Sequence, residues 1–292
     1  MTNEPVGLVG LGLLGAAIAE RLISAGYELS GYDLATDRMA HFKSLGGRPA
    51  SGVGETARIC RRTILCLPDS DSVEEVAAQL LPQLKPGDVV IDMTTGDFER
   101  TRTLARSYAK LDVDWIDASV LGSSTCMRQG EATLLVGGDK RQLEKHAELL
   151  HCLGRSMHHA GPVGSGQALK LAANLVLGLN RTALAEGLVF AERCGVDLEV
   201  TLEAFCDGVA YSRCMDDKGP KMLKGDFVPV ARLRQHLKDV RLLLKSASAG
   251  NFSLPMTRAH SEVLEQAMQM DLGEQDNSAV IEAIRGYRSR GV

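Results

Sequence analysis

Hydrophobic and polar positions follow two different patterns along the chain. Up to about residue 160, short apolar runs such as VGLV, TILCLP, DVVIDM and ATLLVGG alternate with stretches whose apolar residues recur at helical spacing. This alternation predicts an α/β domain with a doubly wound, mostly parallel sheet, which is the Rossmann type of fold. Beyond Pro162 the strand pattern stops and only helical periodicity continues.

The change near Pro162 predicts two domains: residues 1–162, built on the sheet, and residues 163–292, entirely helical. The pattern from Ser165 to Cys194 would form one long helix joining them, about 45 Å in length at 1.5 Å per residue. This segment is apolar nearly all round. We therefore expect neighbours to bury the helix on every face.

A glycine-rich turn follows the first apolar run. The letters GLGLLG stand between a strand pattern and a helix pattern, the context that gives a G-x-G-x-x-G motif its meaning. Gly10 would allow the turn, Gly12 would let the backbone approach a pyrophosphate, and Gly15 would let the helix pack on the strand. The amino end of the helix favours phosphate. The turn predicts cofactor contacts at Gly10, Leu11, Gly12, Leu13, Leu14 and Gly15.

An acidic residue ends the second strand pattern. Asp33 lies roughly twenty residues beyond the glycines, where a carboxylate can accept hydrogen bonds from the adenosine ribose hydroxyls and repel a 2′-phosphate. The sequence therefore favours NAD over NADP. Arg38 is the only nearby cation that would soften this choice.

One lysine stands in the apolar part of the long helical pattern. Gly166, Lys170, Asn174 and Gly178 recur four residues apart and form one stripe, in which the glycines would leave room for a ligand. Burial disfavours a charged ammonium group and so favours its use in proton transfer. The amide of Asn174 would hold a substrate oxygen. Two plainer alternatives are that Lys170 reaches the surface or pairs with a carboxylate such as Glu186.

Composition narrows the partners and the compartment. The 292 residues carry a net charge of −4 without a basic tail, so no nucleic-acid partner is expected. The apolar runs are too short or too interrupted for a membrane span. Seven cysteines without a C-x-x-C pair indicate neither a disulfide framework nor a metal site, and no signal peptide is evident, so a cytoplasmic location is expected. Structural or surface roles are expected for Cys126, His158 and His159.

The chain resembles the β-hydroxyacid dehydrogenase family, which includes 3-hydroxyisobutyrate dehydrogenase, tartronate semialdehyde reductase and 6-phosphogluconate dehydrogenase. The resemblance spans the chain through GLVGLGLLG, CLPDSDSVEEV, IDMTT, DASVLGSSTCMRQGEATLLVGG, GSGQALKLAAN, QHLKDVRLLL and DLGEQDNSAVIEAI. It implies hydride transfer between NAD, or less readily NADP, and a short β-hydroxy acid or its semialdehyde, similar to 3-hydroxyisobutyrate. It also implies a homodimer or homotetramer formed through the helical domain.

The resemblance also implies residue roles. Lys170 corresponds to the family's catalytic general acid and base, and Asn174 to the amide that supports it at the substrate. Lys238, in HLKD, corresponds to a lysine that reaches the cofactor and active site, beside Asp239. The further cofactor contacts implied in this way are Leu67, Pro68, Thr95 and Lys238.

The substrate loop departs from the family pattern. Relatives usually read D-A-P-V-S-G-G where this chain reads DASVLGS, so that Leu121 replaces a hydroxyl residue and Ser123 a glycine. Gly122, Ser123 and Ser124 are still expected to bind the acid group of the substrate. The substrate would be bulkier or less polar than in relatives, or its acid group would be a different one such as a sulfonate. Arg128 either adds a charge-assisted contact or faces solvent.

Two alternative functions are considered for this fold. Similar two-domain folds reduce imines or sulfonate aldehydes, and the fold can also serve as a non-catalytic nucleotide-binding module. Lys170 and Asp33 argue against imine reduction, because imine reductases of this build usually replace the lysine. The set Lys170, Asn174 and Lys238 argues against a non-catalytic module.

Overall fold

The computed structural model describes residues 4–287 and shows two compact units, Met1–Lys170 and Leu171–Val292. Each unit has its own hydrophobic core. The boundary between the units falls inside the long helix α9 (Ser165–Arg193), whereas the sequence places the domain boundary in the preceding loop at 162/163. The difference arises because the first turn of α9 is hydrogen-bonded to the sheet.

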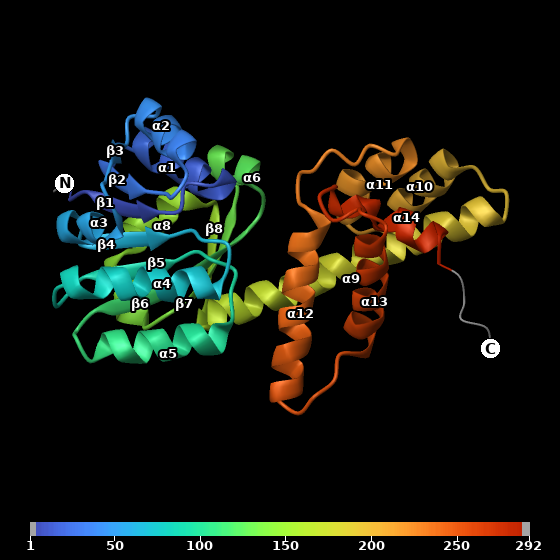
Figure 1. Ribbon diagram of the computed structural model, residues 1–292. Helices are drawn as coiled ribbons and strands as arrows, with labels where there is room; N and C mark the ends of the chain where they lie inside the picture. Colours follow the sequence, from blue (N-terminus) through green and yellow to red (C-terminus); the bar gives the residue numbers. More distant parts are fainter. Residues whose placement is uncertain (1–3, 288–292) are drawn as a thin grey trace. The chain divides into compact units, whose positions relative to one another are not determined.

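The first unit is built on one eight-stranded sheet with the order β3-β2-β1-β4-β5-β6-β7-β8 (Figure 1). Its strands are β1 (Val6–Val9), β2 (Leu29–Tyr32), β3 (Arg48–Pro49), β4 (Arg62–Leu65), β5 (Val89–Asp92), β6 (Asp114–Leu121), β7 (Thr133–Gly137) and β8 (Ser156–Gly161). All neighbours are parallel except β6 and β7. This confirms the predicted mostly parallel, doubly wound sheet, although neither the short β3 nor the reversal at β7 was predicted.

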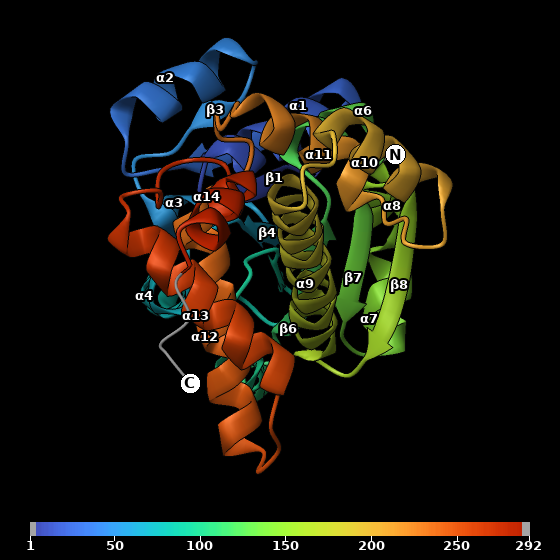
Figure 2. The same ribbon diagram turned by 90° about the vertical axis from the view of Figure 1, so that its right-hand side faces the viewer.

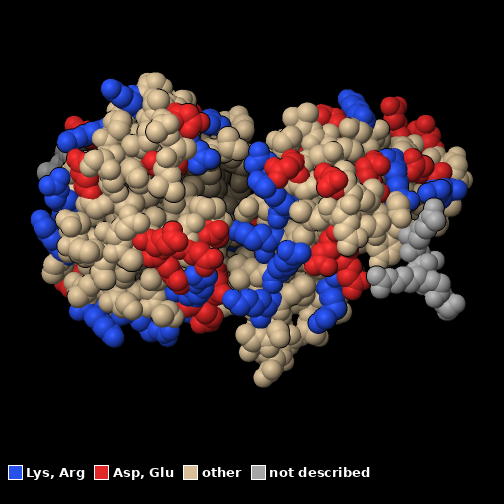
Figure 3. Space-filling model, viewed as in Figure 1, with Lys and Arg blue, Asp and Glu red and all other residues tan. Residues whose placement is uncertain are grey.

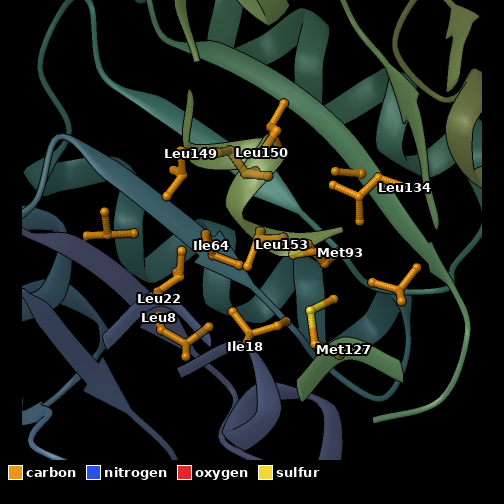
Figure 4. Close-up of a cluster of buried hydrophobic side chains, with 14 of the residues drawn as sticks. Leu8, Ile18, Leu22, Ile64, Met93, Met127, Leu134, Leu149, Leu150 and Leu153 are labelled. Carbon is orange, nitrogen blue, oxygen red and sulfur yellow. The ribbon is translucent and has the colours of Figure 1, made fainter. Parts of the chain in front are cut away.

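Helices cover both faces of this sheet. They are α1 (Leu13–Ser24), α2 (Thr36–Ser44), α3 (Val53–Ile59), α4 (Ser70–Leu80), the 3₁₀ helix η1 (Leu81–Gln83), α5 (Phe98–Ala109), α6 (Ser124–Gln129), α7 (Lys140–Lys145) and α8 (Ala147–Leu153). Alternate residues of a strand pack into two different hydrophobic cores, because successive side chains point to opposite faces of the sheet. Leu8 and Ile64 join the core with α1 and α8 shown in Figure 4, while Val9 and Leu65 join the core with α3 and α4.

The second unit contains helices only, apart from one isolated bridge between Arg232 and Asp276, among its described residues. After α9 come α10 (Leu198–Asp207), α11 (Cys214–Lys224), α12 (Leu233–Ala249), α13 (Pro255–Gln269), the 3₁₀ helix η2 (Asn277–Ala279) and α14 (Val280–Arg285). Helices α12 and α13 lie side by side (Figure 2). The all-helical second domain predicted from the sequence is thus confirmed.

The long helix α9 is less enclosed than its sequence predicts. Leu184 and Leu188 are buried in the helical core, but Val176, Leu177 and Phe190 are 55%, 43% and 72% exposed. The expectation of burial on every face is therefore wrong for a single chain, because the helices of this unit cover only part of its circumference. None of the helices in residues 4–287 combines the length and the hydropathy needed to cross a membrane.

Candidate active site

The three glycines of the motif meet three different demands in the turn between β1 and α1. Gly10 has a positive φ of 94°, and a Cβ there would collide with the carbonyl oxygen of Cys66. A Cβ at Gly15 would collide with the carbonyl oxygen of Gly10. At Gly12, by contrast, the nearest atom is an Arg38 guanidinium nitrogen 3.9 Å away, so the space above this residue is open. Gly12 is also the N-cap of α1 and lacks a side chain to occupy that space.

Asp33, directly after β2, is tied to the glycine turn. Its Oδ2 accepts a hydrogen bond from the backbone N–H of Leu11 at 2.7 Å, and its Oδ1 accepts one from Ala35 at 2.9 Å. The Arg38 guanidinium lies 3.3 Å from Oδ2 and is half exposed, at 51%, whereas the carboxylate is 8% exposed. The carboxylate of Asp33, predicted to select the cofactor, therefore lies beside the glycine turn. It is paired with the long, half-exposed side chain of Arg38.

The predicted contacts after β4 and β5 lie at the same edge of the sheet, because these strands are parallel neighbours of β1. Leu67 and Thr95 are half-buried and Pro68 is exposed. The backbone N–H of Leu67 donates to the hydroxyl of Thr94 at 3.1 Å, which joins the two loops. In open α/β sheets this carboxyl edge is where ligands bind.

In the loop after β6, one side chain predicted to bind the substrate instead forms a hydrogen bond within the loop. The hydroxyl of Ser123 caps α6 by accepting a hydrogen bond from the N–H of Cys126 at 3.2 Å. Gly122 is exposed with φ 150°, and Ser124 is half-buried. Arg128 is exposed to solvent, as one of its two predicted alternatives has it, and it pairs with Glu20 on α1 at 2.9 Å.

Lys170 is half-buried within α9, in the first unit. The glycines beside it serve helix packing instead of leaving space for a ligand. A Cβ at Gly166 would collide with the carbonyl oxygen of Leu135, and one at Gly178 would lie 2.5 Å from His236 Nε2. Glu186, the predicted alternative partner of Lys170, lies more than four turns further along the helix, roughly 24 Å at 1.5 Å per residue, and cannot reach it.

In the helical unit, the predicted site residues Asn174 and Lys238 both contact the carboxylate of Asp239. The side-chain amide of Asn174 donates to Asp239 Oδ2 at 3.0 Å, and Lys238 Nζ lies 3.7 Å from Oδ1 of the same carboxylate. Asp239 is 6% exposed. Figure 3 shows Lys and Arg side chains gathered over this part of the unit, where α12 carries Arg234, Lys238, Arg241 and Lys245. Within this stripe, Arg234 is paired with Glu274 and Arg241 with Glu265.

Sequence reasoning missed three buried polar residues near Lys170. Asp92 and Asp117 end or follow apolar runs on neighbouring strands, and both hydrogen-bond to Gln167 in the first turn of α9. A carboxylate within an otherwise buried strand pattern is a signal that the sequence did contain, because such groups need partners.

In the part of the chain that the structure describes, no group of three or more metal-ligating side chains occurs, and the cysteines are free.

Comparison with known proteins agrees with this geometry. The model for the NAD binding domain of 6-phosphogluconate dehydrogenase matches residues 5–161, and that for the NAD-binding domain of NADP-dependent 3-hydroxyisobutyrate dehydrogenase matches residues 164–284. The chain is 31% identical over 280 residues to 2-(hydroxymethyl)glutarate dehydrogenase of Eubacterium barkeri, covering 94% of this chain and 93% of that protein. It is 30% identical over 285 residues to 2-hydroxy-3-oxopropionate reductase of Escherichia coli K12, covering 96% of each.

A solved structure of 3-hydroxyisobutyrate dehydrogenase from Mycobacterium tuberculosis, with L-serine, is similar in fold, with a TM-score of 0.90 at 23% identity over 97% of this chain and 99% of that one. The glycine turn, the sheet and the helical unit thus define an NAD(P)-dependent oxidoreductase that acts on CH–OH groups. The chain belongs to the β-hydroxyacid dehydrogenase family.

Proposed function

We propose that this enzyme transfers a hydride between NAD(H) and a short β-hydroxy acid or its semialdehyde, with Lys170 as the general acid and base. The observation that carries the proposal is the position of Lys170 in α9, close to the turn that is hydrogen-bonded to the sheet. It lies within one helical turn of Gln167, whose backbone and side chain are hydrogen-bonded to carboxylates at the carboxyl edge of the sheet. A half-buried lysine at that edge can give a proton to a carbonyl oxygen or take one from a hydroxyl.

The glycine turn supports NAD as the cofactor. The open space above Gly12 and the exposed amino end of α1 fit a pyrophosphate, and the Asp33 carboxylate fits a ribose diol. Bound NAD supplies the hydride acceptor. Leu67, Pro68 and Thr95 would contact it from the neighbouring loops, and the family resemblance adds Lys238 as a further contact.

The substrate contacts that the family resemblance implies are Gly122, Ser123, Ser124, Lys170 and Asn174. We assign its acid group to the backbone of Gly122 and Ser123 and to Ser124, since the Ser123 hydroxyl is already used as a helix cap. Asn174 would hold the reacting oxygen or its neighbour, and its bond to Asp239 fixes the orientation of its amide. Leu121 makes the loop less polar than in relatives, which favours a substrate with an apolar branch.

The proposal is tested by nicotinamide absorbance during turnover with a panel of acids and aldehydes. The panel comprises 3-hydroxyisobutyrate, D-glycerate, tartronate semialdehyde, succinic semialdehyde, a sulfonate aldehyde and a cyclic imine, each with NAD(H) and NADP(H). We expect turnover of a hydroxy acid or semialdehyde, faster with NAD(H). Turnover of the imine alone, or NADH binding without turnover of any member, would contradict it.

The exposed side of α9 supports a homodimer or homotetramer. Val176, Leu177 and Phe190 are large apolar residues at its surface, and covering them removes apolar area from water. We propose that a second copy of the chain covers this side.

A further inference from the structure

Two buried carboxylates attach the beginning of α9 to the sheet. Asp117, on β6, accepts hydrogen bonds from the N–H groups of Gly164 at 2.6 Å and Gln167 at 2.8 Å. Such groups at the amino end of a helix lack partners within the helix, and the helix dipole favours an anion there. Asp117 is completely buried, so these bonds are shielded from water. The first turn of α9 is therefore fixed to β6.

Asp92, at the end of the neighbouring strand β5, extends this attachment. Its Oδ2 accepts a hydrogen bond from Gln167 Nε2 at 3.0 Å, and its Oδ1 accepts one from the N–H of Thr94 at 2.9 Å. The Thr94 hydroxyl in turn accepts the N–H of Leu67 at 3.1 Å. One chain of hydrogen bonds thus runs from the loop after β4 to the first turn of α9.

We propose that Asp92 is a positioning residue that acts through Thr94 and Gln167. It would hold the loop at Leu67 and the helix that carries Lys170 in one fixed arrangement. The inference rests on the proposed function, because it takes this loop as a cofactor contact and Lys170 as the group that transfers the proton. A hydride acceptor and a proton donor must be placed together to act on one substrate carbon and its oxygen, and small misplacement is costly.

The charge of Asp92 decides whether this network is complete. Burial raises the pKa of Asp92 to about 7, and the nearby Asp117 carboxylate also raises it, while the hydrogen bonds from Thr94 and Gln167 oppose the shift. Cys66, directly after β4, lies near Asp92, but burial and the Asp92 carboxylate raise the pKa of its thiol to about 12, so it stays neutral. An ionised Asp92 accepts every donor that faces it, whereas a protonated carboxyl presents an O–H to donors. The network is therefore complete above about pH 7 and weakened below.

A purely structural role for Asp92 would predict a change in stability without a change in how cofactor affinity depends on pH. The test is NADH binding by nicotinamide fluorescence between pH 6 and 8.5. We expect the Kd of the wild type to fall about fivefold to tenfold across this range, since one pKa unit of coupling corresponds to a factor of ten. Asp92→Asn should bind with a constant Kd close to the wild-type value at pH 6.

Asp88→Asn is the matched control. Asp88 is also buried, but it precedes β5 at the opposite edge of the sheet and pairs with Arg61 at 3.0 Å. This variant should keep the wild-type pH dependence. The same pH dependence in Asp92→Asn as in the wild type would overturn the inference, and so would a flat profile in the wild type.

Conservative replacement of Thr94 gives a second readout if Asp92→Asn folds poorly. Thr94→Ser keeps the hydroxyl and should preserve both the pH profile and kcat, whereas Thr94→Val should lose the profile and lower kcat about tenfold, with a smaller change in the KM of the acid or aldehyde. Equal behaviour of the two variants would overturn the inference. NADH binding does not depend on turnover, so failure to find any substrate would count against the proposed function and leave this test intact.

Discussion

At the scale of single residues, we expect the choice between NAD and NADP to depend on Asp33 and on Arg38, which is paired with it. The Asp33 carboxylate already accepts backbone hydrogen bonds from Leu11 and Ala35, which hold it in place. Arg38 contributes only a long contact to it, 3.3 Å from Oδ2, and its side chain is half exposed. Arg38 can therefore move toward a 2′-phosphate without breaking the bonds that fix Asp33.

Arg38→Ala tests this division of roles. We expect kcat/KM with NADH to change by less than about threefold, because the backbone still orients Asp33. With NADPH we expect a loss of about tenfold, the size of one charge-assisted contact. The measurement is kcat/KM with both cofactors for wild type and variant. An equal loss with NADH and NADPH would show that Arg38 instead orients Asp33.

Some residue roles could be predicted from the sequence because their causes are local. The demands on Gly10, Gly12 and Gly15 follow from a tight strand–turn–helix segment, and the structure places each as expected. The hydroxyl of Ser123 could not be placed in the same way. Its use as a helix cap depends on where α6 begins, and helix starts are poorly fixed by sequence periodicity.

At the scale of elements, a histidine pair, of which His260 is buried and His236 half-buried, joins α9, α12 and α13. The Thr182 hydroxyl donates to the carbonyl of Gly178 at 3.1 Å, so its oxygen accepts from His260 Nδ1 at 2.7 Å. His260 Nε2 then faces His236 Nε2 at 2.8 Å. Burial, followed by the nearby Arg181 charge, lowers the pKa of His260 to about 4 and that of His236 well below its usual value. Both imidazoles are therefore neutral where these helices pack.

This pair makes the stability of the helical unit depend on pH. The folded pKa of His260 lies below its unfolded value of 6.5, so the unfolded chain binds the proton first as the pH falls. The free energy of unfolding is therefore highest above pH 6.5 and falls as the pH approaches 4. Between pH 6.5 and 5.0 it falls by about 2 kcal/mol. His260→Gln should flatten this decline in calorimetric scans. A variant that loses stability on acidification as steeply as the wild type would contradict the assignment.

Strongly periodic elements were predicted to within about two residues. The helix predicted from Ser165 to Cys194 corresponds to Ser165–Arg193 in the structure. Strand β3 has two residues and too little pattern to be recognised. The antiparallel direction of β7 was also missed, because an apolar run indicates a buried strand but carries no sign of its direction.

At the scale of the whole molecule, the buried network around Asp92 shows what sequence alone leaves out. Gln167 lies 75 residues from Asp92 and 50 from Asp117 along the chain, yet it bonds to both. No local pattern links such positions. The apolar circumference of α9 was read correctly from the sequence, but which part of it this chain covers depends on how the helices of its unit pack.

The exposed side of α9 leads to a prediction about assembly. We expect light scattering to give a dimer or tetramer at micromolar concentration, because Val176, Leu177 and Phe190 together expose much apolar surface. Replacing both Val176 and Phe190 by lysine should shift the mass to the monomer, since charges in an apolar interface are costly. A wild-type monomer at working concentration would contradict the proposed homo-oligomer.

Lys170 is proposed to transfer the proton during hydride transfer. The most direct measurement is kcat of Lys170→Ala on the substrate identified from the panel, together with its Kd for NADH and with Lys140→Ala, an exposed lysine on α7, as control. We predict that Lys170→Ala lowers kcat by about 10²–10⁴-fold while NADH binding changes less than twofold, and that Lys140→Ala behaves as the wild type. Near-normal kcat in Lys170→Ala would contradict the account.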